Sequence, residues 1–325
     1  MTESNDHPAA VVVVTGANGL VGSLTCAALV DRGAAVRAVV RRAGTAPALE
    51  AVEEWVGDFY DPELAARVVA GATAVVTTVH PMRTDRETQH RIAVEGTPVV
   101  ARAARDAGVD RLVHISTAAV YDRSPGTGDV DEDTALVGDD ADAYAVTKRD
   151  TDAALAAIDG LTRVIVRPPA ILGPGESSMW NSVRPAAIRD DEQARHAVPQ
   201  QSFAWVHVDD LVALVADVAS GRVETSPDPD GGPVEGGCTV VNVAADPATA
   251  REYYDTVTGA LGVRPVWEDR PAWTGRILAG RAHGWGWTPR WISRGRWRRS
   301  TRDCAPSRSA TRLWSRVAPD RDRAS

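Results

Sequence analysis

Short aliphatic runs alternate with longer stretches of helical periodicity along the first half of the chain. The runs predict six β-strands, and apolar positions three or four apart predict helices in most of the intervals between them. Strands that are continuously apolar and separated by helices are typical of a parallel sheet covered on both faces. We therefore predict an α/β fold with a doubly wound parallel sheet, which binds ligands outside the carboxyl ends of its strands. The strands are expected over residues 11–14, 36–40, 52–56, 74–79, 111–115 and 163–166.

Three glycines lie where the first predicted strand meets the first predicted helix. They are Gly16, Gly19 and Gly22 in the run Thr-Gly-Ala-Asn-Gly-Leu-Val-Gly over residues 15–22. Glycines at such a junction permit a tight turn and close approach of a ligand, while the helix N-terminus offers free N–H groups and a positive dipole to a pyrophosphate. The segment predicts a dinucleotide site in a Rossmann-type sheet. Close packing of strand on helix without a ligand is the alternative.

A second pattern is the spacing of Tyr144 and Lys148. Lys148 is the single lysine among 36 Lys and Arg residues, and it follows Tyr144 by four positions in a predicted helix over residues 143–155. Residues four apart share one face of a helix, so the phenol and the ammonium project the same way. An ammonium favours phenolate and lowers a tyrosine pKa from about 10, which suits proton transfer. By itself the spacing fits a surface pair on an amphipathic helix as well.

Seven ordered segments resemble the extended short-chain dehydrogenase/reductases, which include NAD(P)-dependent epimerase/dehydratase-like and dihydroflavonol-reductase-like enzymes. The resemblance extends from about residue 11 to residue 290, where a Gly-Trp-x-Pro-like element lies at 286–289. The family implies hydride transfer between a nicotinamide cofactor and a carbonyl or secondary alcohol of a small molecule. The seven segments are residues 15–22, 57–61, 96–109, 115–121, 144–148, 167–175 and 206–211.

The resemblance also implies roles for individual residues. Tyr144 matches the catalytic acid and base, and Lys148 matches the lysine that tunes it and binds the nicotinamide ribose. Thr117 matches the hydroxyl that places the substrate oxygen, with Ser116 as the neighbouring alternative. The cofactor is assigned to Gly16, Asn18, Gly19, Leu20 and Gly22 in the loop, to Asp58 beside the adenine ring, and to Tyr144 and Lys148.

The end of the second predicted strand indicates which nicotinamide cofactor the chain prefers. Relatives that prefer NAD carry an acidic residue there for the ribose 2′-hydroxyl, whereas arginine suits the 2′-phosphate of NADP. This chain has Arg41 and Arg42 and no acidic residue. We predict NADP(H), with NAD(H) as the second choice. Two exposed arginines without a ligand are the alternative.

Departures from the family pattern narrow the reaction. Ala118 and Ala119 follow Thr117 where dehydratases carry an acidic pair, which disfavours dehydration. Ala93 stands where many relatives have Asn, which puts the proton-relay or helix-kink role of that position in doubt. His80 follows the fourth strand and could approach the cofactor or the substrate, but we favour a structural histidine.

The second half of the chain is predicted to set substrate specificity. Residues 179–205 have mixed polarity without a period, residues 225–237 indicate an exposed loop rich in Pro, Gly and Asp, and a strand over 240–243 precedes a helix over about 248–261. We divide the chain into a dinucleotide-binding core with the catalytic residues over residues 1–170, a smaller C-terminal substrate-binding lobe over 171–290 that is interleaved with the last core elements, and a tail over 291–325.

Composition excludes several other classes. The chain has 44% hydrophobic and 25% charged residues, which is typical of a soluble globular protein, and no apolar run reaches the ~20 residues of a membrane span. Three distant cysteines predict neither a disulfide framework nor a metal site. We expect a cytoplasmic protein with a small-molecule substrate and no nucleic-acid or membrane partner, and we leave a homodimer open.

Charge is distributed unevenly along the chain. Residues 290–325 carry eleven Arg and three Asp, a net charge of +8, so residues 1–289 carry −16 of the total of −8. The tail has no helical or strand period, which predicts poor order, and its Arg, Trp and Ser content fits a shifted reading frame in GC-rich DNA.

Two alternatives to an NADP(H)-dependent oxidoreductase remain at this point. One is an NAD-dependent sugar-nucleotide epimerase, which the lack of a clear Arg and Lys cluster mildly disfavours. The other is a dinucleotide-binding regulator without turnover, which would not need Thr117, Tyr144 and Lys148.

Overall fold

The computed structural model describes residues 10–82 and 84–291. All of the predicted tail except Trp291 therefore lies outside the described residues. No helix in residues 10–82 and 84–291 is long and apolar enough to cross a membrane.

A seven-stranded sheet forms the centre of the molecule, and every neighbouring pair in it is parallel. The strand order is β11-β6-β5-β4-β1-β2-β3, so the direction of winding reverses between β1 and β4 and leaves a crevice for ligands there. The predicted doubly wound sheet and its six strands are confirmed, although β4 ends two residues earlier than expected. The strands are β1 (Val11–Thr15), β2 (Ala35–Val40), β3 (Val52–Val56), β4 (Ala74–Thr77), β5 (Arg111–Ile115), β6 (Thr162–Arg167) and β11 (Cys238–Asn242).

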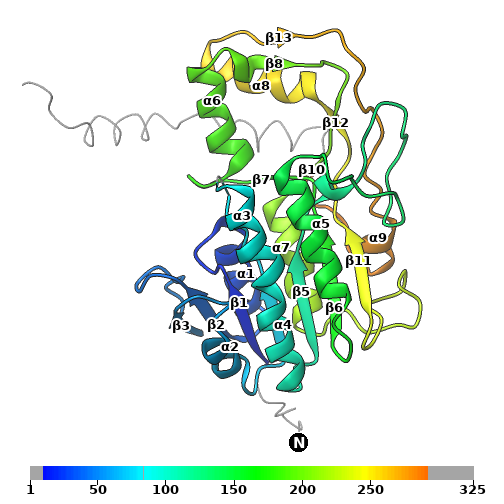
Figure 1. Ribbon diagram of the computed structural model, residues 1–325. Helices are drawn as coiled ribbons and strands as arrows, with labels where there is room; N and C mark the ends of the chain where they lie inside the picture. The colour runs from blue at the N-terminus through cyan, green and yellow to red at the C-terminus, as the bar shows by residue number, and fades with distance from the viewer. Residues whose placement is uncertain (1–9, 83, 292–325) are drawn as a thin grey trace, which may run out of the picture.

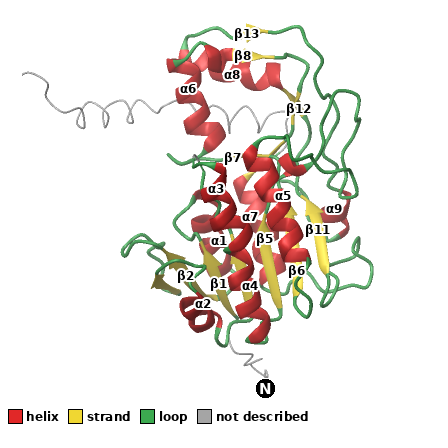
Figure 2. Cartoon of the chain, viewed as in Figure 1, coloured by secondary structure: helices red, strands yellow, loops and turns green. Residues whose placement is uncertain are grey.

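Helices cover both faces of this sheet, as Figures 1 and 2 show. Successive residues of a strand point to opposite faces, so Val12 and Val14 pack in one core with α1 and α7, while Val13 packs in a second core with α2, α4 and α5. The apolar runs of the sequence are thus explained by burial on two sides. These helices are α1 (Leu20–Val30), α2 (Pro62–Val69), α4 (Thr97–Asp106), α5 (Ala143–Ala156) and α7 (Val208–Ala219).

A smaller group of elements lies above the sheet in Figure 1, with α6, α8, β8 and β13 at the top of the view. Its core includes Leu172, Ile188, Phe203, Trp205 and Tyr253. The group comprises β7 (Ala170–Leu172), a π-helix (Met179–Val183), α6 (Arg184–Asp190), β8 (His196–Ala197), β9 (Ser202–Phe203), β10 (Trp205–His207), β12 (Ala248–Thr249), α8 (Ala250–Leu261) and β13 (Val266–Trp267).

The sequence pattern did not predict α6, which falls in the stretch of mixed polarity. The helix has seven residues, Pro185 stands in its first turn, and Ile188 is fully buried. Two turns are too short for an apolar period, so packing of one or two side chains against the rest of the lobe stabilises the helix instead. The strand expected over 240–243 is β11, and the helix expected from about 248 is α8.

Short elements complete the described chain. In the first turn of α7, the buried carboxylate of Asp210 accepts hydrogen bonds from the backbone N–H groups of Arg290 and Trp291, both at 3.0 Å. The Trp291 ring stacks on His207 with ring centres 4.2 Å apart. The last described residues are therefore attached to the core. The remaining elements are α3 (Arg86–Gln89), a π-helix (His90–Glu95), two 3₁₀ turns (Ala118–Val120 and Gln193–Arg195) and α9 (Gly280–Gly284).

Candidate active site

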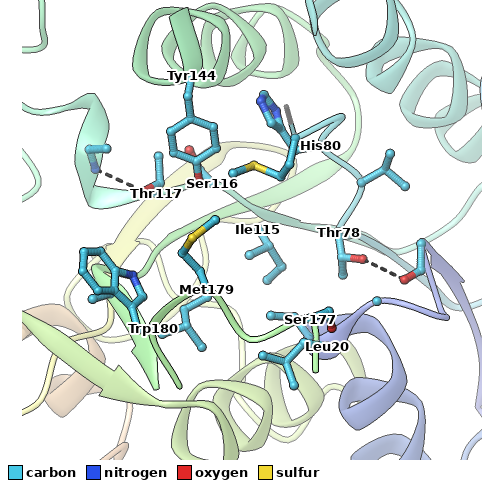
Figure 3. A pocket seen from close by; sticks show the side chains of 18 of the residues that line it. Leu20, Thr78, His80, Ile115, Ser116, Thr117, Tyr144, Ser177, Met179 and Trp180 are labelled. Carbon is cyan, nitrogen blue, oxygen red and sulfur yellow. Dashed lines mark hydrogen bonds between the residues drawn. The ribbon is translucent and has the colours of Figure 1, made fainter. Parts of the chain in front are cut away.

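A cavity of about 890 Å³ lies between the carboxyl ends of β1, β4 and β5 and the smaller group of elements above them. In Figure 3, Tyr144 and Thr117 project into it from one side and Met179 and Trp180 from the opposite side. Leu20, Ser177 and Thr78 lie at another end of it in the same view. The cavity is at the position where a doubly wound sheet binds its ligands.

The glycine segment forms one end of the cavity. Gly16 has a φ of +71°, which favours glycine, and a Cβ on Gly22 would lie 2.2 Å from the carbonyl oxygen of Gly16. Helix α1 begins after Gly19 without a hydrogen bond from a side chain, so its first N–H groups remain available. Gly16, Asn18, Gly19, Leu20 and Gly22 all line the cavity. This end has free N–H groups and room for close approach, and its assignment to a pyrophosphate stays a prediction.

The loop after β2 brings one of the two predicted arginines to the cavity. Arg41 and Asp58 line it, and Arg42 is not among the lining residues. The loop is held by the carboxylate of Glu54 on β3, which accepts hydrogen bonds from three backbone N–H groups, those of Gly44 at 2.8 Å and of residues 45 and 46 at 3.0 Å. These bonds lower the pKa of Glu54. No sequence signal pointed to Glu54, because its role depends on the turn geometry.

Tyr144 lies in the first turn of α5, which the side chain of Asp142 caps by accepting a hydrogen bond from the Tyr144 N–H at 2.9 Å. Tyr144, Thr117 and Ser116 all line the cavity. Burial raises the pKa of Tyr144, and the Thr117 hydroxyl opposes that change. The Thr117 oxygen accepts from the Ala119 N–H at 3.1 Å, whereas the buried Ser116 hydroxyl interacts with the carboxylate of Asp152 and lowers its pKa. The structure thus brings the predicted phenol and both candidate hydroxyls together.

Lys148 lies one turn further along α5 and is only 3% exposed. It is not among the residues that line the cavity, and its Nζ donates a hydrogen bond of 2.6 Å to the carbonyl oxygen of Ile115 at the end of β5. Burial lowers the pKa of Lys148 to about 8, although the charge of Asp152 acts in the opposite direction. A buried ammonium therefore lies behind the cavity wall that carries Tyr144.

Further ionisable groups lie beneath Lys148, and the sequence reasoning missed them. Asp152, one turn beyond Lys148, accepts a hydrogen bond from the Nε of Arg167 at 3.0 Å, and both side chains are buried. Burial raises the pKa of Asp152, and the Arg167 charge counteracts part of that change. The ring of His114 is also buried, which lowers its pKa well below the usual value. The spacing of four along the helix, repeated from Tyr144 to Lys148 to Asp152, was the signal available in the sequence.

His80, for which the sequence favours a structural role, lines the cavity beside Tyr144. Its ring meets Tyr144 edge-on with centres 4.8 Å apart, and its Nε2 lies 3.2 Å from the Oε1 of Gln89. The amide of Gln89 donates to the Thr84 carbonyl through Nε2, so its oxygen faces His80 and accepts a hydrogen bond from the Nε2–H of the ring. Burial and the Lys148 charge lower the pKa of His80 to about 3. His80 is thus neutral, and its buried Nδ1 has no partner among the described residues.

Comparison with known proteins gives the family of the chain. The NAD dependent epimerase/dehydratase family matches residues 12–226. Among curated relatives, a sterol demethylase protein B of Methylococcus capsulatus is 34% identical over 62% of this chain and 63% of its own length. A 2-alkyl-3-oxoalkanoate reductase of Stenotrophomonas maltophilia is 34% identical over 52% and 53%, and a ceramide reductase of Caulobacter vibrioides is 31% identical over 66% and 64%. The chain thus spans between about half and two thirds of these relatives.

Solved structures of the same fold cover nearly the whole chain. The Bordetella bronchiseptica enzyme WbmG in complex with NAD has a TM-score of 0.73 at 18% identity and covers 94% of this chain and 97% of its own. MoeE5 in complex with UDP-glucuronic acid and NAD has a TM-score of 0.64 at 22% identity, covering 86% and 93%. These likenesses support the fold alone. With the match to residues 12–226, the chain belongs to the NAD dependent epimerase/dehydratase family.

Proposed function

We propose that the protein is an NADP(H)-dependent reductase or dehydrogenase that interconverts a carbonyl and a secondary alcohol on a small molecule. One observation carries the proposal: Tyr144, Thr117 and the glycine segment line the same cavity, with the buried Lys148 directly behind Tyr144. The names of the curated relatives, a ketoreductase and several other reductases and hydroxysteroid dehydrogenases among them, support this class over epimerisation.

Separate groups of residues would bind the parts of the cofactor. The amides at the start of α1 would hold the pyrophosphate, and Arg41 would pair with the 2′-phosphate, which would give the preference for NADP(H) over NAD(H). Asp58, which also lines the cavity, would bind the adenine ring. A bound nicotinamide supplies or accepts the hydride. Glu54 acts at a distance, because its three hydrogen bonds keep the loop after Arg41 in place.

Tyr144 donates a proton to the substrate oxygen during reduction and removes one during oxidation. Burial raises the pKa of its phenol, which keeps the phenol protonated and ready to donate. The positive charge of Lys148 then stabilises the phenolate that remains after the proton has left. Thr117 donates a hydrogen bond to the same substrate oxygen and so places it against the phenol.

The test consists of two cofactor titrations followed by measurements on three variants. Purified protein is titrated with NADPH and with NADH, by energy transfer from tryptophan to the reduced nicotinamide, and NADPH is expected to bind more tightly. Tyr144→Phe should bind NADPH as the wild type does and lose about 10²-fold or more in turnover. Turnover at the wild-type rate in Tyr144→Phe would refute the assignment.

Two matched variants test which hydroxyl, that of Thr117 or that of Ser116, binds the substrate oxygen. Thr117→Val removes the hydroxyl and keeps the shape, and it should reduce kcat by at least about tenfold. Ser116→Ala should change kcat little, because Ser116 is the alternative that the family pattern does not favour. The reverse order of effects would transfer the role to Ser116.

A further inference from the structure

The cavity extends beyond the proposed cofactor site to an end lined by arginines. Arg123, Arg184 and Arg270 line this end together with Trp180, Phe203 and Tyr254. Asp58 is the one acidic residue among the described lining residues, and it lies after β3, at the proposed adenine site. The lining at the lobe end is therefore cationic.

Arg184 has no acidic partner in the described part of the chain. Its Nη2 donates a hydrogen bond of 2.6 Å to the hydroxyl of Tyr254, and its Nε is buried without a partner. Its guanidinium lies 6.0 Å from the centre of the Tyr254 ring. A guanidinium has five N–H donors, so most of its hydrogen-bonding capacity is unused here.

Arg123 is in a similar position. It is half-buried, its guanidinium lies 5.6 Å from the centre of the Trp273 ring, and no described residue forms an ion pair or hydrogen bond with it. Burial lowers the pKa of Arg123, and no nearby carboxylate opposes this change. The Trp273 carbonyl accepts from the N–H of Ser202, a lining residue beside Phe203, so Arg123 packs on a segment that borders the cavity near Phe203.

The third arginine at this end is already paired. Arg270 donates to Glu268 at 2.7 Å, and the same carboxylate lies 3.1 Å from the Nδ1 of His196. Glu268 is therefore shared by two partners and does not neutralise Arg123 or Arg184.

Among the described residues, the other buried or half-buried arginines have an acidic partner or donate to backbone carbonyls. Arg167 pairs with Asp152, and Arg163 donates to several backbone carbonyls, including those of Ala156 and Gly236. A partly desolvated cation without an anion costs free energy. Residues 1–289 carry a net charge of −16, so a cationic end of the cavity is not a consequence of overall charge. A bound anion would offset the cost.

We propose that the substrate is an anion, a ketone or secondary alcohol whose carboxylate or phosphate group binds Arg123 and Arg184. Its carbon body lies against Trp180, Phe203 and Tyr254, and its reacting oxygen faces Tyr144. The position of the reacting oxygen rests on the proposed function. The anionic group of the substrate is inferred from Arg123 and Arg184 alone.

The test compares binding of matched probes. Isothermal titration calorimetry measures the binding of three ketones: 4-acetylbenzoate, its neutral methyl ester and 4-acetylphenyl phosphate. Each ketone is titrated into the protein without cofactor and into the protein with NADP⁺. Neither condition supplies a hydride, so the ketones are not reduced. At least one of the two anions should bind about tenfold or more tightly than the ester, and which of them does so distinguishes a carboxylate from a phosphate site. Equal binding of all three probes would overturn the proposal.

Variants of the two arginines test whether Arg123 and Arg184 bind the anion. Arg184→Met and Arg123→Met should each reduce the preference for the anion by about tenfold and leave the Kd for NADPH unchanged. Arg189→Met is the control, because Arg189 lies on the same helix, is exposed and pairs with Asp190. An anion preference that persists in both variants would refute the assignment to these arginines. Anion binding without any turnover would leave this site in place and refute the proposed function instead.

Discussion

The single lysine makes the buried ammonium of the site directly measurable. Burial of Lys148 lowers its pKa from 10.5 to about 8. At 1.36 kcal/mol for each pKa unit, holding the charged form in the folded protein costs roughly 3 kcal/mol. Lys148 is 3% exposed, so water screens little of this cost. We therefore expect that the charged Lys148 behind Tyr144 lowers the free energy of unfolding.

The pH dependence follows from this lowered pKa. Below about pH 8, Lys148 is charged in the folded and the unfolded state, and the folded state carries the full cost. Between about 8 and 10.5 the unfolded chain binds more protons than the folded one, so the free energy of unfolding rises with pH. The penalty is gone above 10.5. Lys148→Met removes it at every pH but also loses the hydrogen bond to Ile115, so we expect the variant to be about 1–2 kcal/mol more stable at pH 7.

Two assays check this expectation. Protein labelled with ¹³C-lysine gives one side-chain Cε resonance, and its titration should have a midpoint near 8. Urea unfolding of the wild type and Lys148→Met should show a stability difference at pH 7 that shrinks or reverses by pH 10. Arg149→Met is the control, since Arg149 is adjacent but pairs with Asp139 and Asp150. A midpoint at 10 or above, or a stability difference that does not change with pH, would refute the reasoning.

Two further variants test the proposed cofactor site. Gly22→Ala places a Cβ 2.2 Å from the Gly16 carbonyl oxygen, so it should destabilise the fold by roughly 1–3 kcal/mol and abolish NADPH binding, and urea unfolding with a cofactor titration would measure both. An unchanged NADPH affinity in Gly22→Ala would contradict the role of the glycine segment. Arg41→Ala should raise the Kd for NADPH about tenfold or more and leave that for NADH unchanged, because it removes a charge-assisted contact to the 2′-phosphate alone. Equal effects on the two cofactors would count against Arg41.

The sheet could be predicted because the residue pattern that specifies each strand lies within a few neighbouring positions. A strand buried on both faces needs apolar residues at successive positions, as in Val11–Thr15, and this pattern does not depend on distant contacts. The same holds for the glycine segment and for the spacing of Tyr144 and Lys148. Each lies within a few residues of chain, so the sequence alone shows how its members lie relative to one another.

Other features could not be predicted because they depend on contacts between distant parts of the chain. Arg123 and Arg184 face one end of the cavity through Trp273 and Tyr254, which lie 150 and 70 residues further along the sequence. In a chain with many arginines, composition alone cannot distinguish these two from the rest. Glu54 holds a loop only eight to ten residues before it, but the turn geometry that brings these residues together has no signal in the sequence.

The last prediction concerns Asp152 and the field at Tyr144. Arg167 binds the Asp152 carboxylate, and Lys148 donates to a backbone carbonyl, so the ammonium is not paired directly with the acid. Asp152 nevertheless raises the pKa of Lys148. Asp152→Asn keeps the shape and an acceptor for Arg167 but removes the negative charge, so the Lys148 midpoint should fall below that of the wild type in the same ¹³C titration. Lys148 would then lose its proton at a lower pH and cease to stabilise the phenolate of Tyr144, which should move the pH at which turnover falls in parallel. An unchanged or higher midpoint would mean that Arg167 already neutralises Asp152 as seen from Lys148, and that burial alone sets the charge behind the phenol.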